Sequence, residues 1–386
     1  MSGPLDGVRV LDFSTLLPGP FATRWLADLG ADVIRVVAPG GRAAGIGLDP
    51  AVAATLNRNK RSIGLDLKHP ASREPIARLL ARADVLVEQF RPGVMQSLGL
   101  GYDDVRARVP SIVYCSLTGF GQSGPYRRRA GHDLTYLAMA GVLSYSGREG
   151  EPPVPQGVQM ADFAGAFSAV AAILTALYRG ARGGSKALGE HLDVAMCDAA
   201  MSLNVLYGAP VLAGADVPRA GREVLNGGSL YDCYRTRDGR YLSVGSLEPK
   251  FLAAFFETIG RPDLASRASG GMAARARDGA TKQIVADAIA QRTLAEWTRV
   301  FEAVDACVEP VLDLAEVAEH PHTRAREMVV DLGGSRQFAH PVKYSAGGAE
   351  YRHAGRADGA ETDDVLRELG FIQFEIASIR DSGAVR

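Results

Sequence analysis

Strand-like and helix-like segments alternate through the first 120 residues, and this alternation constrains the fold more than any other feature of the chain. Short apolar runs predict the strands, and apolar residues at helical spacing predict the helices between them. The predicted strands cover residues 8–14, 32–37, 84–90 and 111–121, and the predicted helices cover residues 18–31 and 72–83. Parallel strands need crossover connections of this kind. The sequence therefore predicts a parallel α/β sheet with ligand sites in the loops at the carboxyl ends of its strands.

The later part of the chain changes character near residue 225. An alanine-rich stretch over residues 159–184 predicts a long buried helix, and residues 189–207 predict a strand that leads into another helix. Residues 229–246 alternate around the pair Asp238–Gly239, which is typical of a β-hairpin. We expect a large Rossmann-like domain over residues 1–195, a linker over 196–224, a small α/β domain over 225–315, and a linker with a C-terminal segment over 316–386.

Composition and charge exclude several classes of partner. The 43 Lys and Arg side chains nearly balance the 44 Asp and Glu side chains, so the net charge of −1 gives no general attraction to nucleic acid or to anionic membranes. The four cysteines are far apart and form no C-x-x-C pair, which argues against a disulfide scaffold or a zinc site. We see no targeting signal and no segment that approaches a membrane span. We therefore expect a cytoplasmic protein with no nucleic acid, membrane or metal partner.

The common cofactor and hydrolase motifs are absent. The turn at residues 16–25 contains neither G-x-G-x-x-G nor G-x-x-x-x-G-K-[ST], so a Rossmann-like sheet does not imply a dinucleotide or a nucleoside triphosphate here. No G-x-S-x-G turn and no H-E-x-x-H helix is present either. These absences argue against a serine hydrolase and against a catalytic metal.

Three titratable residues could carry chemistry, and each also has a structural interpretation. His132 lies between a basic run and an apolar segment, and an imidazole with a pKa of about 6.5 can serve as a general base or as an ordinary structural side chain. Asp162 lies at a predicted helix start, where an aspartate is either an acid or base or a helix cap. Glu248 precedes Pro249 at another predicted helix start, where a carboxylate also opposes the helix dipole.

Basic residues gather near the predicted strand and loop ends of the α/β half. Such positions commonly bind phosphate groups, and each residue could also be ordinary solvated surface charge. The residues are Arg58, Lys60, Arg61, Lys68 and Arg91.

Taken together, several long segments resemble the family III CoA-transferase superfamily, and within it the racemase branch. The resemblance covers nearly the whole chain to about residue 330, and the C-terminal tail matches poorly. The segments that carry it are "LDFSTLLPGPFATRWLADLGADVIRV", "RNKRSIGLDLK", "EQFRPGVMQSLGLGYDD", "LTGFGQSGP", "AGHDLTYLAMAGVLSYSGR", "GEHLDVAMCDAAMSL", "NGGSLYDCYRTRDGRYLSVGSLEPKF" and "DACVEPVLDLAEV".

The resemblance implies an interlocked homodimer, in which two chains pass through one another like links. Each chain would have a large Rossmann-like domain, a small α/β domain and long linkers, with the tail returning to the large domain. Acyl-CoA would bind between the large domain of one subunit and the small domain of the other, with no metal or redox cofactor. CoA is then part of the substrate.

The resemblance also assigns roles to the three titratable residues. His132 and Asp162 would lie on opposite faces of the substrate α-carbon, with Glu248 paired to the histidine. Inverting that carbon needs one group to remove its proton and another to return a proton from the opposite side. The intermediate is an enolate, and by resemblance backbone N–H groups near Gly131 and Asp133 would stabilise it. We expect burial among apolar neighbours to raise the pKa of Asp162.

Position by position, the resemblance assigns a set of CoA contacts. Two positions depart from the family, because Ala38 and Ser97 stand where close relatives carry arginines toward the CoA phosphates. Arg35, Arg58, Lys60 or Arg61 would then compensate. The matched contacts are Leu65, Asp66, Leu67, Lys68, Gln89, Phe90, Arg91, Gly131, Asp133 and Tyr136.

Two other functions compete with racemisation. In a CoA-transferase the aspartate at position 162 would attack the thioester and form an acyl anhydride that passes CoA to another acid. A non-catalytic acyl-CoA-binding protein would use the same scaffold without chemistry. The transferase branch does not need a base on the opposite face, and there the histidine at position 132 is usually missing. The presence of His132 and Glu248 therefore favours a racemase, whose acyl group the sequence does not identify.

Overall fold

The computed structural model describes residues 3–39, 49–183, 189–268 and 279–385, which fold into two compact units. The large unit contains residues 1–140, 158–203 and 321–386, and the small unit contains residues 141–157 and 204–320. These boundaries differ from the expected ones, because residues 141–157 belong to the small unit. They are held there by the hydrogen bond from the Tyr145 hydroxyl to Asn204 Oδ1 (2.6 Å) and by the ion pair of Arg148 with Asp232 (2.6 Å).

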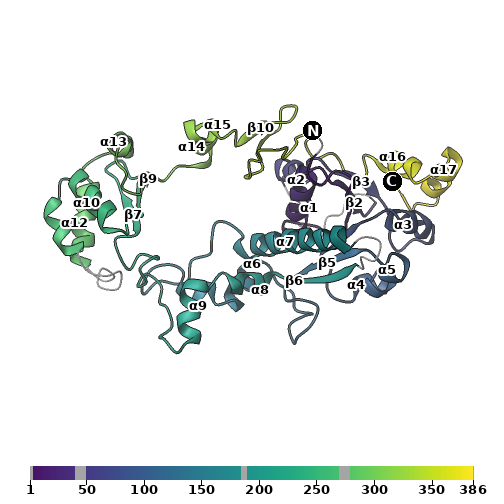
Figure 1. Ribbon diagram of the computed structural model, residues 1–386, viewed down its shortest axis with the longest axis horizontal. Coiled ribbons are helices and arrows are strands. Elements are labelled where there is room, and N and C mark those ends of the chain that lie inside the picture. The colour runs from purple at the N-terminus through teal and green to yellow at the C-terminus, as the bar shows by residue number, and fades with distance from the viewer. Residues whose placement is uncertain (1–2, 40–48, 184–188, 269–278, 386) are drawn as a thin grey trace. The chain divides into compact units, whose positions relative to one another are not determined.

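A six-stranded sheet forms the centre of the large unit (Figure 1). Its order is β3-β2-β1-β4-β5-β6, and every neighbouring pair is parallel. This is the doubly wound Rossmann order, so the predicted parallel α/β sheet is confirmed. The strands are β1 (Arg9–Asp12), β2 (Asp32–Val37), β3 (Arg61–Gly64), β4 (Val85–Glu88), β5 (Val113–Thr118) and β6 (Glu190–Ala195).

Helices cover the sheet of the large unit and complete its core. One apolar cluster joins strand residues such as Leu86 to α3 and to the C-terminal helices. On α1, Phe21 makes edge contacts with Phe163 and Phe167 of α7, at ring distances of 4.8 and 5.4 Å. The helices are α1 (Pro18–Asp28), α2 (Pro50–Leu56), η1 (Pro70–Ser72), α3 (Arg73–Leu80), α4 (Val94–Ser97), α5 (Tyr102–Arg108), α6 (Asp133–Met139), α7 (Met160–Gly183) and α8 (Met196–Ser202).

The C-terminal segment belongs to the large unit and binds the edge of its sheet, where Figure 1 shows α16 beside β3. Glu361 Oε2 accepts a hydrogen bond from the backbone of Ser62 (2.8 Å), and Thr362 Oγ1 accepts one from Gly64 (3.0 Å). Polar side chains of this tail therefore accept hydrogen bonds from backbone N–H groups of the edge strand β3. Its elements are α15 (Pro321–Ala325), β10 (Val329–Asp331), β11 (Arg336–Phe338), α16 (Thr362–Glu368) and α17 (Gln373–Asp381).

The small unit is built on a three-stranded antiparallel sheet in the order β7-β8-β9. The expected hairpin joins β7 to β8, and Gly239 in its connection has a φ of +78°, a value that glycine adopts without strain. Trp297, Phe255 and Phe256 fill the core behind this sheet. The elements are η2 (Val142–Tyr145), α9 (Val205–Leu212), β7 (Asp232–Arg235), β8 (Tyr241–Val244), α10 (Pro249–Thr258), η4 (Pro262–Ala268), α12 (Gly279–Ile289), α13 (Leu294–Phe301), β9 (Val308–Pro310) and α14 (Leu314–Glu319).

Among the described helices, α7 is long and apolar enough by composition to cross a membrane. This differs from our expectation that no segment reaches that length. In the structure α7 packs against α1 and α8 and against β5 and β6, as a core helix does. All four cysteines are free thiols; Cys115 and Cys197 are buried, and Cys233 and Cys307 are exposed.

Candidate functional site

The direction of the sheet order reverses between β1 and β4, and the loops that follow these strands define the place where doubly wound sheets bind ligands. Gln89, Phe90 and Arg91 follow β4 directly. Gln89 Oε1 accepts a hydrogen bond from the backbone of Gly19 in the first turn of α1 (3.2 Å). The turn after β4 is thereby tied to the start of α1, which places the predicted Gln89–Arg91 contacts at the switch point.

Glu88, the last residue of β4, accepts a hydrogen bond from the turn that follows it. It was not among the residues that the sequence indicated. Its carboxylate is buried and accepts a hydrogen bond from the backbone of Phe90 (2.8 Å). Burial raises the pKa of Glu88 to about 6, with the nearby Asp193 adding to the effect and the hydroxyl of Ser116 opposing it. An acidic residue in an otherwise apolar strand, "VLVEQF", was the only signal in the sequence that could have indicated this role.

His132 and Asp162 lie at the starts of two helices that a contact between Asp133 and Asp162 joins. Asp133 and Asp162 are 29 residues apart in the sequence. His132 precedes α6 as its N-cap residue, and Asp133 begins that helix. Asp133 Oδ1 accepts hydrogen bonds from the backbones of Ala161 (2.7 Å) and Asp162 (3.1 Å) in the first turn of α7. One carboxylate therefore joins the start of α6 to the start of α7. His132 itself is solvent-exposed in the single chain.

Asp162 does not cap α7, because Asp133 supplies the acceptor that caps this helix. The Asp162 side chain is half-buried beside Phe163, which packs edge-on against Phe21. Burial raises the pKa of Asp162 to about 7, and the negative charge of Asp133 adds to the shift. The helix-cap interpretation thus fails, and the carboxyl group can accept and donate a proton near neutral pH.

The backbone turn at Gly131 is fixed by Tyr136. The Tyr136 hydroxyl donates to the Gly131 carbonyl (2.6 Å), and a Cβ at position 131 would lie 2.4 Å from the Tyr136 ring. Burial raises the pKa of Tyr136 to about 12, with Asp162 adding to the effect and Arg91 opposing it. The charges of Asp162 and Arg91 therefore both affect the pKa of Tyr136. This couples the turn before α6 electrostatically to the turn after β4.

Two predicted CoA contacts are instead buried structural cations. The Arg58 guanidinium binds both carboxylate oxygens of Asp28 and the Phe338 carbonyl, and the side chain is fully buried. Lys60 Nζ binds Asp12 Oδ2 (3.1 Å) and the Pro20 carbonyl (2.9 Å). Both side chains are buried and bond to oxygens of the protein, so neither is exposed to a ligand phosphate. We therefore remove both residues from the candidate site.

Arg35 and Arg61, the other two residues expected to replace the family's CoA-phosphate arginines, also form ion pairs. Arg35 pairs with Asp358 (3.0 Å), and Arg61 pairs with Asp32 and Glu368 (2.6 Å each). Ala38 and Ser97 are exposed.

The segment after β3 contributes one exposed cation to the site. Leu65 is buried in the core, Leu67 and Phe90 pack partly against the same core, and Asp66 receives a hydrogen bond from the backbone of Lys68 (3.0 Å). Lys68 itself is exposed. Of the residues assigned to the CoA site, Lys68 and Arg91 are the cations that the structure leaves accessible.

Glu248 lies in the small unit, where it is the N-cap residue of α10 with Pro249 after it. Its side chain makes no capping hydrogen bond. Among the described residues no group of three or more His, Cys, Asp or Glu side chains could hold a metal ion.

The doubly wound parallel sheet defines a Rossmann-like α/β protein, and Asp133 brings the helix starts that carry His132 and Asp162 together in it. The chain belongs to the CoA-transferase family III, whose profile matches residues 5–357.

Curated relatives within this family have two kinds of activity. The chain is 36% identical to the mouse (Mus musculus) alpha-methylacyl-CoA racemase, an alignment that covers 99% of this chain and 97% of that protein. It is 32% identical to the acetyl-CoA:oxalate CoA-transferase of Acetobacter aceti, over 95% of each chain. A crystal structure of a CAIB/BAIF family protein from Brucella suis aligns with a TM-score of 0.83 and 29% identity, and covers 96% of this chain and all of that one.

Proposed function

We propose that the protein is a racemase that interconverts the (2R) and (2S) isomers of 2-methylacyl-CoA thioesters by proton transfer at the α-carbon. The observation that carries the proposal is the linked pair of helix starts, with an imidazole at α6 and a carboxyl group of pKa about 7 at α7. One of the two groups removes the α-proton, and the other donates a proton to the opposite face. The similarity to the mouse racemase supports the same reaction.

The enolate formed between the two proton transfers needs an electrostatic partner. The first N–H groups of an α-helix have no acceptor within that helix. The start of α6 at Asp133 offers such groups close to Gly131, and the Tyr136 hydroxyl holds this turn in place. We assign the thioester oxygen to this turn, where backbone donors stabilise the developing negative charge.

The alternative is CoA transfer with Asp162 as nucleophile, as the name of the Acetobacter relative indicates for that protein. A nucleophilic carboxylate acts in its ionised form. With a pKa raised to about 7, Asp162 is about half protonated at neutral pH, which suits a group that both takes and gives a proton. His132 has no role in anhydride chemistry, so its position beside α7 favours racemisation.

We further propose that the active enzyme is an interlocked homodimer and that Glu248 of one subunit pairs with His132 of the other. His132 is exposed in the single chain, and Glu248 lies in the other compact unit with a side chain that caps nothing. Apolar side chains around the start of the small unit are also exposed, including Val205 (68%) and Leu212 (91%). A second subunit would cover such side chains.

CoA is part of the proposed substrate, and the proposed reaction uses no separate cofactor. Lys68 and Arg91 would bind its phosphates, while Gln89 and Phe90 line the turn at the switch point.

The test is to incubate one enantiomer of a 2-methylacyl-CoA with the purified protein in the absence of an acceptor acid and to follow chirality by chromatography of the released acid. A racemase brings the mixture to equal amounts of both isomers. A parallel sample with added oxalate or succinate would reveal a CoA-transferase by the new thioester. Binding without either change would identify a non-catalytic acyl-CoA-binding protein.

A further inference from the structure

Three polar side chains on neighbouring strands of the large sheet form a hydrogen-bonded chain. They are Glu88 on β4, Ser116 on β5 and His191 on β6. Glu88 and Ser116 are register partners on parallel strands, and the Ser116 hydroxyl forms a hydrogen bond with the Glu88 carboxyl group. Ser116 Oγ also lies 3.0 Å from His191 Nε2. The chain therefore runs without a break from β6 to the end of β4.

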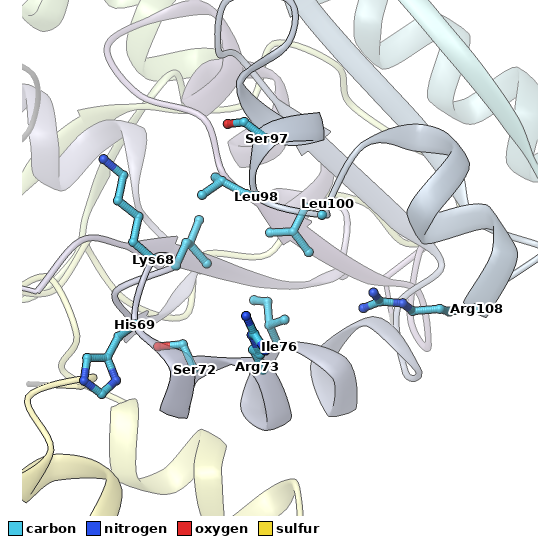
Figure 2. A pocket seen from close by; sticks show the side chains of 11 residues that line it. Lys68, His69, Ser72, Arg73, Ile76, Ser97, Leu98, Leu100 and Arg108 are labelled. Carbon is cyan, nitrogen blue, oxygen red and sulfur yellow. The ribbon is translucent and has the colours of Figure 1, made fainter.

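Aromatic packing fixes the outer end of this chain. The His191 ring is half-buried, stacks on Tyr102 at 4.9 Å and lies edge-to-face with Tyr114 at 5.4 Å. The Tyr114 hydroxyl donates to the Leu100 carbonyl (2.9 Å), and Figure 2 shows Leu100 at the wall of the neighbouring cavity. These contacts hold the imidazole with Nε2 at hydrogen-bonding distance from Ser116.

The inner end of the chain holds the turn after β4. Glu88 and Ser116 are only 4% and 2% exposed, and the Glu88 carboxylate accepts from the backbone of Phe90 (2.8 Å). A charged acceptor forms a stronger hydrogen bond than a neutral one. Ser116 and His191 thus reach this turn through a single carboxyl group.

Neighbouring titratable groups influence the charge at both ends. Burial raises the pKa of Glu88 to about 6, and Asp193 on β6 adds to the shift. Burial lowers the pKa of His191, whereas Asp193 and Asp103 on α5 oppose this. Two groups on β5 stay neutral because burial and the charge of Glu88 raise their pKa values; they are Tyr114 and Cys115. At pH 8 the chain therefore joins an ionised carboxylate to a neutral imidazole.

The Ser116 hydroxyl carries one proton, so the direction of the chain depends on the protonation of Glu88. An ionised carboxylate only accepts, so Ser116 donates to Glu88 and His191 Nε2–H donates to Ser116. A protonated Glu88 can donate to Ser116, which then donates to His191 Nε2. Both hydrogen bonds persist in the two states, but neutral His191 changes from the Nε2–H to the Nδ1–H tautomer.

We propose that Ser116 and His191 are positioning residues that act through Glu88 on the turn after β4, and that their hydrogen-bond chain reverses direction when Glu88 takes up a proton. The first part rests on the proposed function, in which this turn binds acyl-CoA. The second part does not, because it concerns the ligand-free protein.

NMR of the protein with ¹³C-labelled histidine rings tests the reversal, and His191→Gln identifies the signal of His191. We expect the Nε2–H tautomer in the wild type at pH 8. At the same pH, Glu88→Gln should shift His191 to the Nδ1–H tautomer, because its amide group donates to Ser116 as a protonated carboxyl group does. Ser116→Ala should make the tautomer of His191 insensitive to Glu88→Gln. The same tautomer in the wild type and in Glu88→Gln would overturn the second part.

Titration calorimetry with CoA at pH 8 tests the positioning role. Ser116→Ala and His191→Phe should each weaken binding about two- to threefold, as expected for the loss of one hydrogen bond. Neither should weaken it further when combined with Glu88→Ala, because both act through that carboxyl group. His191→Gln keeps a donor near the position of Nε2 and should bind CoA nearly as the wild type does.

Ser62→Ala is the matched control, because Ser62 is also a buried serine of the sheet whose hydroxyl donates to a buried carboxylate, that of Glu361 (3.2 Å). It should leave the affinity for CoA and the His191 signal unchanged. Losses of affinity that add to that of Glu88→Ala, or full affinity in Ser116→Ala and His191→Phe, would overturn the first part. Absence of CoA binding by the wild type would overturn it together with the proposed function. CoA binding without racemisation would count against the proposed reaction alone.

Discussion

Asp162 is the residue whose environment departs most from that of an ordinary surface aspartate in the site. Its backbone N–H is satisfied by Asp133, so the side chain is free of the capping role that a helix start usually gives an aspartate. Partial burial beside Phe163 and the charge of Asp133 then raise its pKa to about 7. Asp133, which bonds to the start of α7, therefore also contributes to the raised pKa of Asp162.

The raised pKa makes a prediction about stability that does not depend on activity. A carboxyl group whose folded-state pKa exceeds its unfolded value stabilises the fold at low pH, and this stabilisation is lost as the pH rises from about 4 to about 7. Asp162→Asn should therefore unfold a few degrees above the wild type at pH 8.5, and this difference should be much smaller at pH 4.5. The full shift corresponds to about 4 kcal/mol, and partial solvent exposure reduces the expected gain to about 1–2 kcal/mol.

Differential scanning calorimetry at the two pH values, at one protein concentration, measures this difference. Asp198→Asn is the matched control, because Asp198 is an exposed aspartate in the first turn of α8. Equal shifts of Asp162→Asn at both pH values would show that its carboxyl group has an ordinary pKa.

Removing either acid–base group should abolish racemisation. General acid–base catalysis contributes about 10²–10⁴-fold, so His132→Ala and Asp162→Asn should each lower kcat by at least about a hundredfold. Each variant should still exchange the α-proton of the one enantiomer that faces the remaining group. Chiral chromatography measures racemisation, and proton NMR in D₂O measures exchange. Full activity in either variant would remove that residue from the mechanism.

At the scale of elements, the site depends on short connections that the sequence patterns only partly revealed. Apolar periodicity correctly predicted most strands of the sheet and the long helix α7, because these elements are buried and regular. It did not identify β3, whose four residues, "RSIG", contain a single large apolar side chain. The sequence left a helix cap as one of two interpretations of Asp162, whereas the cap of α7 comes from Asp133, a contact across 29 residues that no local pattern encodes.

Glu88 should act as a positioning residue for the turn after β4. Glu88→Ala removes the acceptor of the Phe90 backbone N–H, so the Gln89–Arg91 turn loses one of its two anchors. We expect KM for acyl-CoA to rise several-fold with little change in kcat, because in the proposed function this turn binds CoA and does not contact the α-carbon. Glu88→Gln keeps an acceptor oxygen and should restore most of the affinity.

Steady-state kinetics of the two Glu88 variants check this role. Equal effects of both substitutions on kcat and KM would indicate a general loss of the fold instead, and thermal unfolding of each variant provides the control.

At the scale of the whole molecule, the sequence did not indicate which charged side chains are buried. Arg58 and Lys60 were expected to face CoA, but their partners Asp28 and Asp12 lie 30 and 48 residues away, and the ion pairs form only when the sheet is assembled. The compact units also divide the chain differently from the expected domains, because residues 141–157 are held in the small unit by contacts with Asn204 and Asp232. Such long-range pairs are a property of the complete fold.

A shared active site predicts that two inactive variants can complement each other. A dimer of one His132→Ala chain and one Glu248→Gln chain would contain one site with both residues intact, if His132 and Glu248 come from different subunits. Co-expression with two affinity tags isolates this mixed dimer. We expect about half of the wild-type activity, and the two homodimers should have little. An inactive mixed dimer would place both residues of each site in one chain.

The isotopic composition of the first product tests the two-base mechanism most directly. One enantiomer of 2-methylacyl-CoA is incubated in D₂O without an acceptor acid, and early samples are separated by chirality and analysed by mass spectrometry. Two opposed groups predict that the inverted isomer carries a solvent deuteron at the α-carbon while the remaining substrate is still largely protonated. An inverted isomer that retains the original hydrogen would contradict the account, because a single base would then have carried that hydrogen from one face to the other.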